Sequence, residues 1–229
     1  MTPKRAPDKI TSAGQSFEKD EDYYQGVRTD LVGLVPHIRG RVLEIGCAEG
    51  LTLDYLHTEF GCEVVGLDYC ESALAKARSK GFEVYVCDLN SQQIPFNDGE
   101  FDYIIIGDVL EHLYDPWSVL NGVVKTMKDD GSILISIPNV KHYSLLKDLI
   151  LRDRWEYSET GLLDVTHIRF FTFDSIMKLL ARSGLTLTTV KQNLVRSQLM
   201  RLLNILCFNK LHSFFVFHYL VVARKITHG

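Results

Sequence analysis

A strand-like run that ends in a glycine-bearing turn constrains this chain more than any other feature. Residues 42–45 are mostly apolar and partly β-branched, which is typical of a strand buried on both faces. The run breaks at Gly46 and reaches Gly50 just before residues 51–56, whose apolar positions have helical spacing. A strand, a glycine turn and a helix N-terminus form a place where backbone N–H groups can approach a ligand closely.

Strand-like and helix-like segments alternate along the rest of the chain. The expected strands cover residues 42–45, 63–68, 82–88, 101–106, 132–137, 185–190 and 214–223. The expected helices cover residues 21–38, 50–60, 71–80, 116–127, 143–151 and 172–183. This alternation predicts right-handed crossovers and a parallel sheet, whose ligands bind beyond the carboxyl ends of the strands.

Three of the expected strands end in an aspartate, namely Asp68, Asp88 and Asp108. Asp68 lies 24 residues after Glu44, close to the spacing at which an acidic residue accepts hydrogen bonds from ribose hydroxyls. A carboxylate suits that task because it accepts two hydrogen bonds from a vicinal diol. Aspartate is also common in turns after strands, so a single one would mean little. Three at corresponding positions, together with the glycine turn, favour a nucleoside site.

Composition and charge exclude several classes of protein. A chain of 229 residues with 46% hydrophobic and 24% charged residues fits one α/β domain. The formal net charge of −4 argues against nucleic acid as a partner. The five cysteines are scattered without a CxxC pair, so we expect no metal site and a reducing, cytoplasmic setting. The N-terminus lacks the apolar core of a signal peptide, and no segment is long enough to cross a bilayer.

Residues 42–50 resemble motif I of the class I S-adenosylmethionine-dependent methyltransferases, which reads E-x-G-x-G-x-G. Glu44, Gly46 and Gly50 match this pattern, and Ala48 stands in place of the middle glycine. Residues 65–68, 87–89 and 101–113 resemble the later motifs of the family in the right order. The resemblance spans at least residues 42–138.

The resemblance implies a Rossmann-like three-layer α/β sandwich, with a mostly parallel seven-stranded sheet and an antiparallel last strand. It implies S-adenosyl-L-methionine as cofactor, with its ribose on Asp68 and its adenine near Asp88 and Leu89. Arg28, on the first expected helix, can reach a carboxylate at the mouth of the turn or can belong to a helix that only caps the sheet. The expected cofactor-binding residues are Arg28, Glu44, Gly46, Cys47, Ala48, Gly50, Asp68, Tyr69, Asp88, Leu89 and Asp108.

The expected domain organisation is simple. Residues 1–18 are polar and form a flexible arm, and residues 19–229 form a single methyltransferase domain. Residues 139–172 resemble the substrate-covering segment of a branch tied to glycan and natural-product pathways, and more distantly the MetW-like proteins. Residues 195–210 carry a helical apolar stripe and are expected to be an insertion. We expect it to pack on the sheet or on a second subunit rather than on a membrane surface, so a homodimer remains open.

Methyl transfer to a hydroxyl needs a group that takes up the proton, and histidine does so near neutral pH. His112 and His167 are the candidate catalytic bases, although each can instead make a structural hydrogen bond. His142, Trp155 and Arg169 are the candidate substrate-binding residues. Glu111 is either a partner of this group or a solvated loop charge.

Three functions follow from these patterns. The first is methyl transfer to oxygen or nitrogen of a small molecule, such as a sugar, a glycan precursor or a secondary metabolite. The second is a MetW-like accessory protein that binds the cofactor without turnover of its own. The third is a nicotinamide-dependent oxidoreductase, against which the acidic Glu44 before the first glycine argues.

Overall fold

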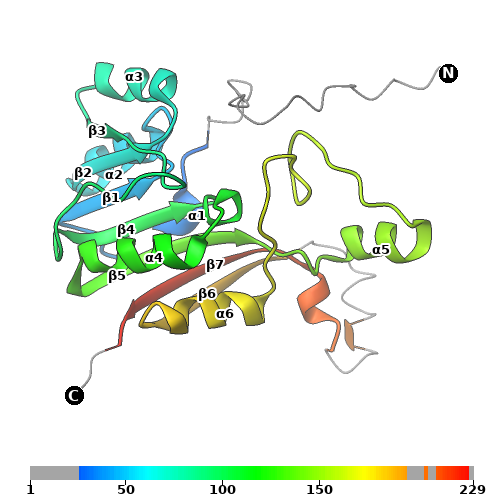
Figure 1. Ribbon diagram of the computed structural model, residues 1–229. Coiled ribbons are helices and arrows are strands. Elements are labelled where there is room, and N and C mark those ends of the chain that lie inside the picture. Colours follow the sequence, from blue (N-terminus) through cyan, green and yellow to red (C-terminus); the bar gives the residue numbers. More distant parts are fainter. Residues whose placement is uncertain (1–25, 195–203, 206–209, 227–229) are drawn as a thin grey trace.

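The computed structural model describes residues 26–194, 204–205 and 210–226 (Figure 1). The expected arm and nearly all of the expected helical insertion lie outside these residues. Within the described residues, we find no helix that is both long and apolar enough to span a membrane.

One seven-stranded sheet forms the centre of the fold. Its strands lie in the order β3-β2-β1-β4-β5-β7-β6. The first five strands in this order are parallel to one another, whereas β7 runs antiparallel to both β5 and β6. The strands are β1 (Arg41–Ile45), β2 (Glu63–Asp68), β3 (Glu83–Val86), β4 (Phe101–Gly107), β5 (Met127–Pro138), β6 (Leu185–Leu194) and β7 (Val216–Lys225). The predicted sheet, including its antiparallel last strand, is confirmed.

Helices cover both faces of this sheet, as Figure 1 shows. The α-helices of the described residues are α1 (Thr29–Val32), α2 (Leu51–Phe60), α3 (Glu71–Ser79), α4 (Pro116–Thr126), α5 (Tyr143–Arg152) and α6 (Phe173–Arg182), and all but α5 lie against the sheet. One buried cluster joins the sheet to α4 and α6, and a second joins it to α1, α2 and α3. Successive β1 residues alternate between the two clusters, since Leu43 belongs to the first and Val42 to the second. The three-layer sandwich is therefore confirmed.

The register of the central strands brings the motif residues to one edge. Ile45, the last residue of β1, pairs with Leu67 of β2 and with Ile106 of β4. Gly46, Asp68 and Asp108 follow these three residues within two positions. The three strands therefore deliver the glycine turn and two of the predicted acids to the same end of the sheet.

Two predicted elements are shorter in the structure than the sequence indicated. The helix expected over residues 21–38 is, in its described part, only the four-residue α1. The amide of Arg28 donates to Oγ1 of Thr52 at 3.1 Å instead of continuing a helix, and Gly33 and Pro36 disfavour helix beyond α1. The strand expected over residues 82–88 is limited to β3, which pairs only with β2 at the sheet edge.

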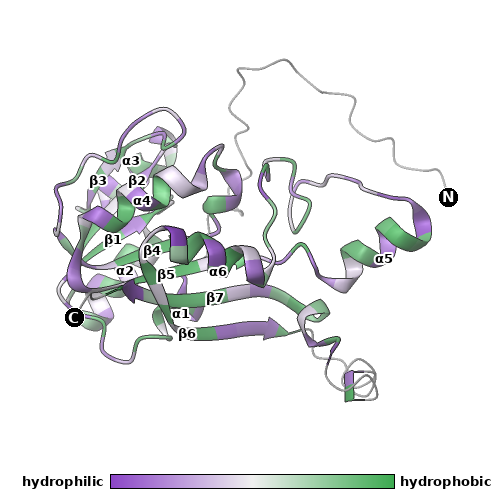
Figure 2. Ribbon diagram, turned by 60° about the horizontal axis from the view of Figure 1, so that its bottom comes forward, coloured by the Kyte–Doolittle hydropathy of each residue, from purple (hydrophilic) through white to green (hydrophobic). Residues whose placement is uncertain are grey.

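Residues 139–172, here called the cover segment, leave the sheet after β5 and return before α6. Its base is closed by a bridge between Asn139 and Phe171, where the amide of Val140 donates to the Phe171 carbonyl at 2.9 Å. The segment contains α5, which stands away from the sheet in Figures 1 and 2 and carries hydrophobic residues there. Both its extent as a substrate-covering segment and its role stay predictions.

Candidate functional site

The turn after β1 has an unusual backbone that only small residues tolerate well. Gly46, Ala48 and Gly50 have φ angles of 78°, 45° and 72°. A Cβ atom on Gly46 would lie 2.6 Å from Cγ2 of Val109, so this position also lacks room. Ala48, where the family has a glycine, adopts the left-handed conformation despite its side chain, at a cost of roughly 1–2 kcal/mol.

Asp68 ties the end of β2 to this turn. Its Oδ2 accepts a hydrogen bond from the amide of Ala48 at 2.9 Å, and its Oδ1 accepts one from the amide of Cys70 at 2.9 Å. Burial raises the pKa of this carboxyl, and the amide hydrogen bonds act against that shift. Each oxygen has a second lone pair, so the carboxylate can still accept from a ligand. Its role towards ribose remains a prediction.

Glu44 lies beneath the turn and is only 4% exposed. A hydrogen bond with Thr52 holds the carboxyl, while its Oε2 is buried with no hydrogen-bond partner among the described residues. Burial raises the pKa of Glu44 to about 8. Burial also raises the pKa of the neighbouring Cys47 thiol, with the Glu44 charge adding to the effect. This thiol is therefore a buried neutral group.

The turn fits the amino-acid end of S-adenosylmethionine. Cys47 and Gly46 direct their amides to the Leu67 carbonyl, and among the described residues Oε2 of Glu44 has no hydrogen-bond partner, so the ionised carboxylate would have an unsatisfied acceptor. A buried acceptor without a partner is costly, and an ammonium group of a bound ligand would satisfy it.

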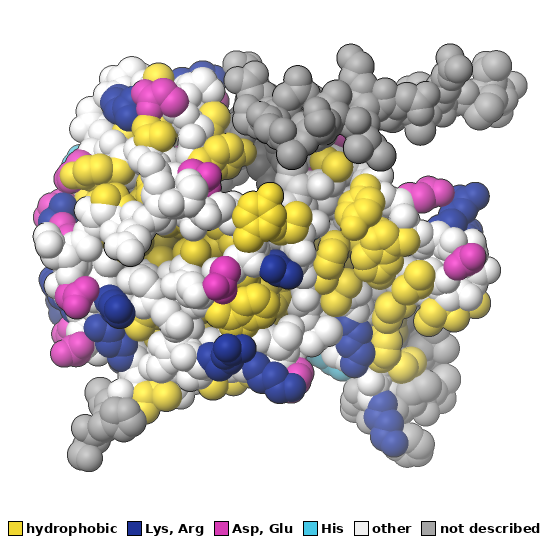
Figure 3. All heavy atoms as spheres, in the orientation of Figure 1, with side chains coloured by type: hydrophobic (Ala, Val, Ile, Leu, Met, Phe, Trp, Pro, Cys, Tyr) yellow, Lys and Arg dark blue, Asp and Glu magenta, His cyan; other side chains and the backbone are white. Residues whose placement is uncertain are grey.

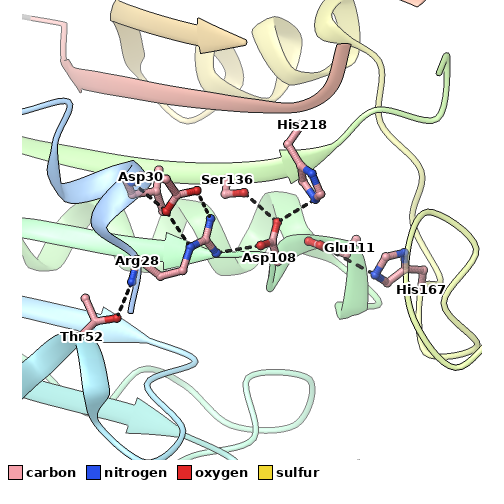
Figure 4. A network of polar contacts seen from close by, with 9 residues as sticks. Arg28, Asp30, Thr52, Asp108, Glu111, Ser136, His167 and His218 are labelled. Atoms are coloured by element: carbon pink, nitrogen blue, oxygen red, sulfur yellow. Dashed lines mark hydrogen bonds and ion pairs between the residues drawn. The ribbon is translucent and has the colours of Figure 1, made fainter. Parts of the chain in front are cut away.

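An ion-pair network joins the segment before β1 to the end of β4 (Figure 4). Nη1 of Arg28 contacts Oδ2 of Asp108 at 2.7 Å, and its Nε contacts Oδ1 of Asp30 at 3.0 Å. Burial lowers the pKa of the Arg28 guanidinium, but the charges of Asp108 and Asp30 raise it by more, so the pKa is raised overall. Arg28 thus contacts a carboxylate at the end of β4, whereas the predicted carboxylate was at the turn after β1, and its role in cofactor binding stays a prediction.

Two members of this network had no sequence signal. Oγ of Ser136 on β5 donates to Oδ1 of Asp108 at 2.7 Å, and Nε2 of His218 on β7 lies 3.5 Å from the same oxygen. Asp108 itself has a φ of 54°. His218 comes from the far end of the chain, and only the pairing of β7 with β5 places it here.

The residues expected near adenine are less enclosed. Asp88 is exposed, and its Oδ1 and Oδ2 accept from the Asn90 amide and the Ser91 hydroxyl at 2.9 and 3.0 Å. Leu89 packs against the core, and Tyr69 is 58% exposed. Asp88 therefore shapes the loop after β3, and its contact with a ligand remains a prediction.

His112 and His167 come together although 54 residues separate them. Their rings lie 4.8 Å apart at 68°. Nδ1 of His112 lies 3.1 Å from the carbonyl of Thr166, and Nδ1 of His167 lies 3.1 Å from the carbonyl of Leu162. A carbonyl only accepts, so the neutral form of each ring would carry its proton on Nδ1 and its lone pair on Nε2.

Glu111 lies beside these histidines and is fully buried, so the alternative of a solvated loop charge was wrong. Its Oε1 lies 3.9 Å from Nε2 of His167 (Figure 4). Burial, followed by the charge of Asp108, raises the pKa of this carboxyl well above its usual range. Its backbone carbonyl accepts from the amides of Ile168 and Arg169, each at 2.9 Å, and so anchors the cover segment.

The three predicted substrate-binding residues make different contacts. His142 caps α5, where its Nδ1 lies 2.8 Å from Oγ of Ser144, and burial lowers its pKa. Trp155 packs against Phe170 with ring centres 5.5 Å apart.

Arg169 makes contacts that differ from those of His142 and Trp155. It donates to the Tyr114 carbonyl and lies 5.7 Å from the ring centre of Trp117. It lines a cavity of about 450 Å³ between α4 and α6, which none of the predicted cofactor residues line. These contacts hold Arg169 beside Tyr114 and Trp117, and its role in substrate binding stays a prediction.

The strand order, the glycine turn and the acids at the strand ends define a class I S-adenosylmethionine-dependent methyltransferase. Residues 5–190 match the model of the family described as Methyltransferase domain, and the chain belongs to this family. The predicted class and its cofactor, S-adenosyl-L-methionine, are thereby confirmed.

Individual relatives agree with this assignment. The chain is 32% identical over 107 residues to a Mycobacterium tuberculosis protein named "Probable S-adenosylmethionine-dependent methyltransferase", covering 46% of this chain and 39% of that protein. It is 30% identical over 151 residues to a ubiquinone biosynthesis O-methyltransferase of Dinoroseobacter shibae, covering 63% and 59%. The match thus spans less than two thirds of either relative's length.

Solved structures share the fold. A SAM-dependent methyltransferase from Archaeoglobus fulgidus has a TM-score of 0.65 at 22% identity, covering 90% of this chain and 97% of that one. An S-adenosylmethionine-dependent methyltransferase from Mesorhizobium loti has a TM-score of 0.61 at 20% identity, covering 86% and 96%.

Proposed function

We propose that this protein transfers the methyl group of S-adenosylmethionine to a small-molecule acceptor at oxygen or nitrogen. The observation that carries the proposal is the bond from the Ala48 amide to Asp68, which joins the glycine turn to the predicted ribose acid. The cofactor supplies the electrophilic methyl group, and the protein supplies alignment and a place for the acceptor's proton.

We assign the cofactor to the edge formed by the turn after β1, Asp68 and Asp108. The unsatisfied Oε2 of Glu44 supports an ammonium group above it. The acceptor then lies between this edge and the cover segment. His112 and His167 meet there, and the Nε2 lone pair of either ring can take a proton from an acceptor hydroxyl.

The cover segment supports an acceptor with an apolar part. Figure 3 shows hydrophobic side chains gathered on the side where Figure 1 draws α5 and the loop that follows it. Exposed members of the cover segment include Ile150, Leu151, Trp155 and Tyr157. A secondary metabolite fits this surface better than an unmodified sugar, and the relatives named ubiquinone biosynthesis O-methyltransferases favour oxygen as the accepting atom.

Two alternative functions are distinguished from methyl transfer by experiment. A MetW-like accessory protein would bind the cofactor without transferring the methyl group. A nicotinamide-dependent oxidoreductase would bind NAD, whereas the antiparallel β7 between β5 and β6 agrees with the methyltransferase order.

The test is a pair of titrations followed by an assay of turnover. Calorimetry with S-adenosylhomocysteine should show binding and calorimetry with NADH should show none. Methyl-labelled cofactor should then label an acceptor among quinols, phenols and sugars. Absence of S-adenosylhomocysteine binding would refute the proposal, and binding without labelling of any acceptor would favour the accessory role.

Asp68→Asn is the critical variant. The asparagine side chain keeps one carbonyl oxygen that can accept from a backbone amide, but it loses the negative charge. We expect the affinity for S-adenosylhomocysteine to fall about 10–100-fold, because a hydrogen bond to a charged group contributes about that much to binding. Asp98→Asn is the matched control, because Asp98 is an exposed turn residue outside the site. Equal affinity in the two variants would contradict the role given to Asp68.

A further inference from the structure

A buried carboxylate and two imidazoles converge outside the cofactor edge. One ligand atom from each of Glu111, His112 and His167 lies within 4.8 Å of the others. Glu111 and His112 belong to the short helical turn after β4, whereas His167 belongs to the cover segment. The cluster therefore joins two parts of the chain that are distant in sequence.

The carboxylate of Glu111 needs an explanation. The residue is 0% exposed, and neither Oε1 nor Oε2 has a hydrogen-bond partner among the described residues. An ionised carboxylate buried in this way is strongly destabilising unless a charge or a hydrogen-bond donor compensates it. The 3.9 Å separation from Nε2 of His167 is too long for a hydrogen bond.

The histidines have the orientation found in metal ligands. Each donates its Nδ1 proton to a backbone carbonyl, from Thr166 in one case and Leu162 in the other. Such second hydrogen bonds fix the tautomer and direct the Nε2 lone pair, as they do for most histidines that bind metals. A hydrogen bond from the Thr166 hydroxyl to Oδ1 of Asp164, at 2.6 Å, stiffens the loop that carries these carbonyls.

We propose that Glu111, His112 and His167 bind a divalent first-row transition-metal cation, with Zn²⁺ as the representative ion. Two imidazoles and one carboxylate suit Zn²⁺, Fe²⁺, Co²⁺ or Mn²⁺, whereas Ca²⁺ and Mg²⁺ prefer oxygen ligands. Donors around tetrahedral Zn²⁺ lie about 3.3 Å apart for bonds of about 2.0–2.1 Å. The three atoms now lie within 4.8 Å of one another. Side-chain rotations that move each donor atom by less than about 1 Å would bring them to that spacing.

The cation would tie the cover segment to the end of β4. The anchor already present there is the pair of amides that donate to the Glu111 carbonyl, and the cation adds a link through the side chains. A ring whose Nε2 binds a cation cannot also take up a proton. In the metal-loaded protein a Lewis acid would therefore replace the histidine base, a consequence that rests on the proposed function.

Metal binding is tested on the full chain after removal of metals with a chelator. Titration with ZnCl₂ should show one equivalent bound, and CoCl₂ should give a visible ligand-field spectrum. Glu111→Gln and His167→Gln should each weaken Zn²⁺ binding at least about 10–100-fold, since even second-sphere changes have such effects. His57→Gln is the matched control, because Nδ1 of His57 also lies beside a backbone carbonyl, that of Cys62 at 3.2 Å, outside the cluster.

The outcomes separate clearly. No Zn²⁺ binding by the wild-type protein, or undiminished binding by both cluster variants, would overturn the proposal. Titration of each variant with S-adenosylhomocysteine reports whether it is folded, because the cofactor edge lies on other residues. Intact cofactor binding without Zn²⁺ binding would refute only the metal site, and intact Zn²⁺ binding without cofactor binding would refute only the proposed function.

Discussion

Replacing Gly46 with alanine probes the turn on which the site depends. Two penalties add in Gly46→Ala. The φ of 78° costs an alanine roughly 1–2 kcal/mol. The new Cβ would lie 2.6 Å from Cγ2 of Val109, and such overpacking costs about 1–3 kcal/mol. We expect the free energy of unfolding to fall by about 2–5 kcal/mol in total.

Gly61→Ala provides the matched control. Gly61 ends α2 with a φ of 66°, and a Cβ there would meet nothing within 4 Å. Only the backbone penalty applies, so this variant should lose about 1–2 kcal/mol. The difference between the two variants isolates the steric contribution of Val109.

Urea unfolding at constant pH measures both losses, and a third background completes the comparison. In Val109→Ala the opposing methyl group is absent, so adding Gly46→Ala should cost only the backbone penalty, about 1–2 kcal/mol. Calorimetry should also show weaker S-adenosylhomocysteine binding in Gly46→Ala but not in Gly61→Ala. Equal losses in Gly46→Ala and Gly61→Ala, or no relief in the Val109→Ala background, would refute the reasoning.

Two further perturbations address the buried acid and a helix cap. Glu44 has a pKa of about 8 in the folded protein against 4.5 when exposed, so the folded state retains a proton that the unfolded chain releases. Stability should therefore fall as pH rises from about 5 to 8, and Glu44→Gln should flatten that fall in urea unfolding at several pH values; an unchanged slope would contradict the shift. Thr172→Ala removes the capping box at α6, in which the Ser175 hydroxyl also accepts from the Thr172 amide at 2.8 Å. It should cost about 1 kcal/mol, or about 2–4 °C in thermal melting, while the exposed Thr160→Ala should melt like wild type.

Local patterns predicted the sheet well because strands, glycine turns and helix starts depend on near neighbours. Residues 42–50 predicted the turn, and the backbone angles at Gly46 and Gly50 agree. The helix expected at residues 21–38 failed because a long-range bond from the Arg28 amide to Thr52 overrides local helical spacing.

The candidate site divides in the same way. Asp68 and Asp108 were found because strand ends are visible in a sequence, whereas Ser136 and His218 were missed because nothing local marks them. The opposite environments of Asp88 and Glu111 were equally hidden, since burial depends on what the rest of the chain places above a residue. The exposed aspartate shapes a loop, and the fully buried glutamate lies beside two histidines.

The sequence by itself determined the order of strands and helices along the chain and the glycine turn, because these follow from short-range periodicity and backbone freedom. The class of cofactor was implied by the resemblance of residues 42–50 to motif I of the methyltransferase family. Tertiary structure alone decided that His167 meets His112 and that His218 meets Asp108. Those encounters depend on where the cover segment returns and on how β7 pairs with β5. The physical reason is that such contacts join residues distant along the chain, which only the complete packing of the sheet brings together.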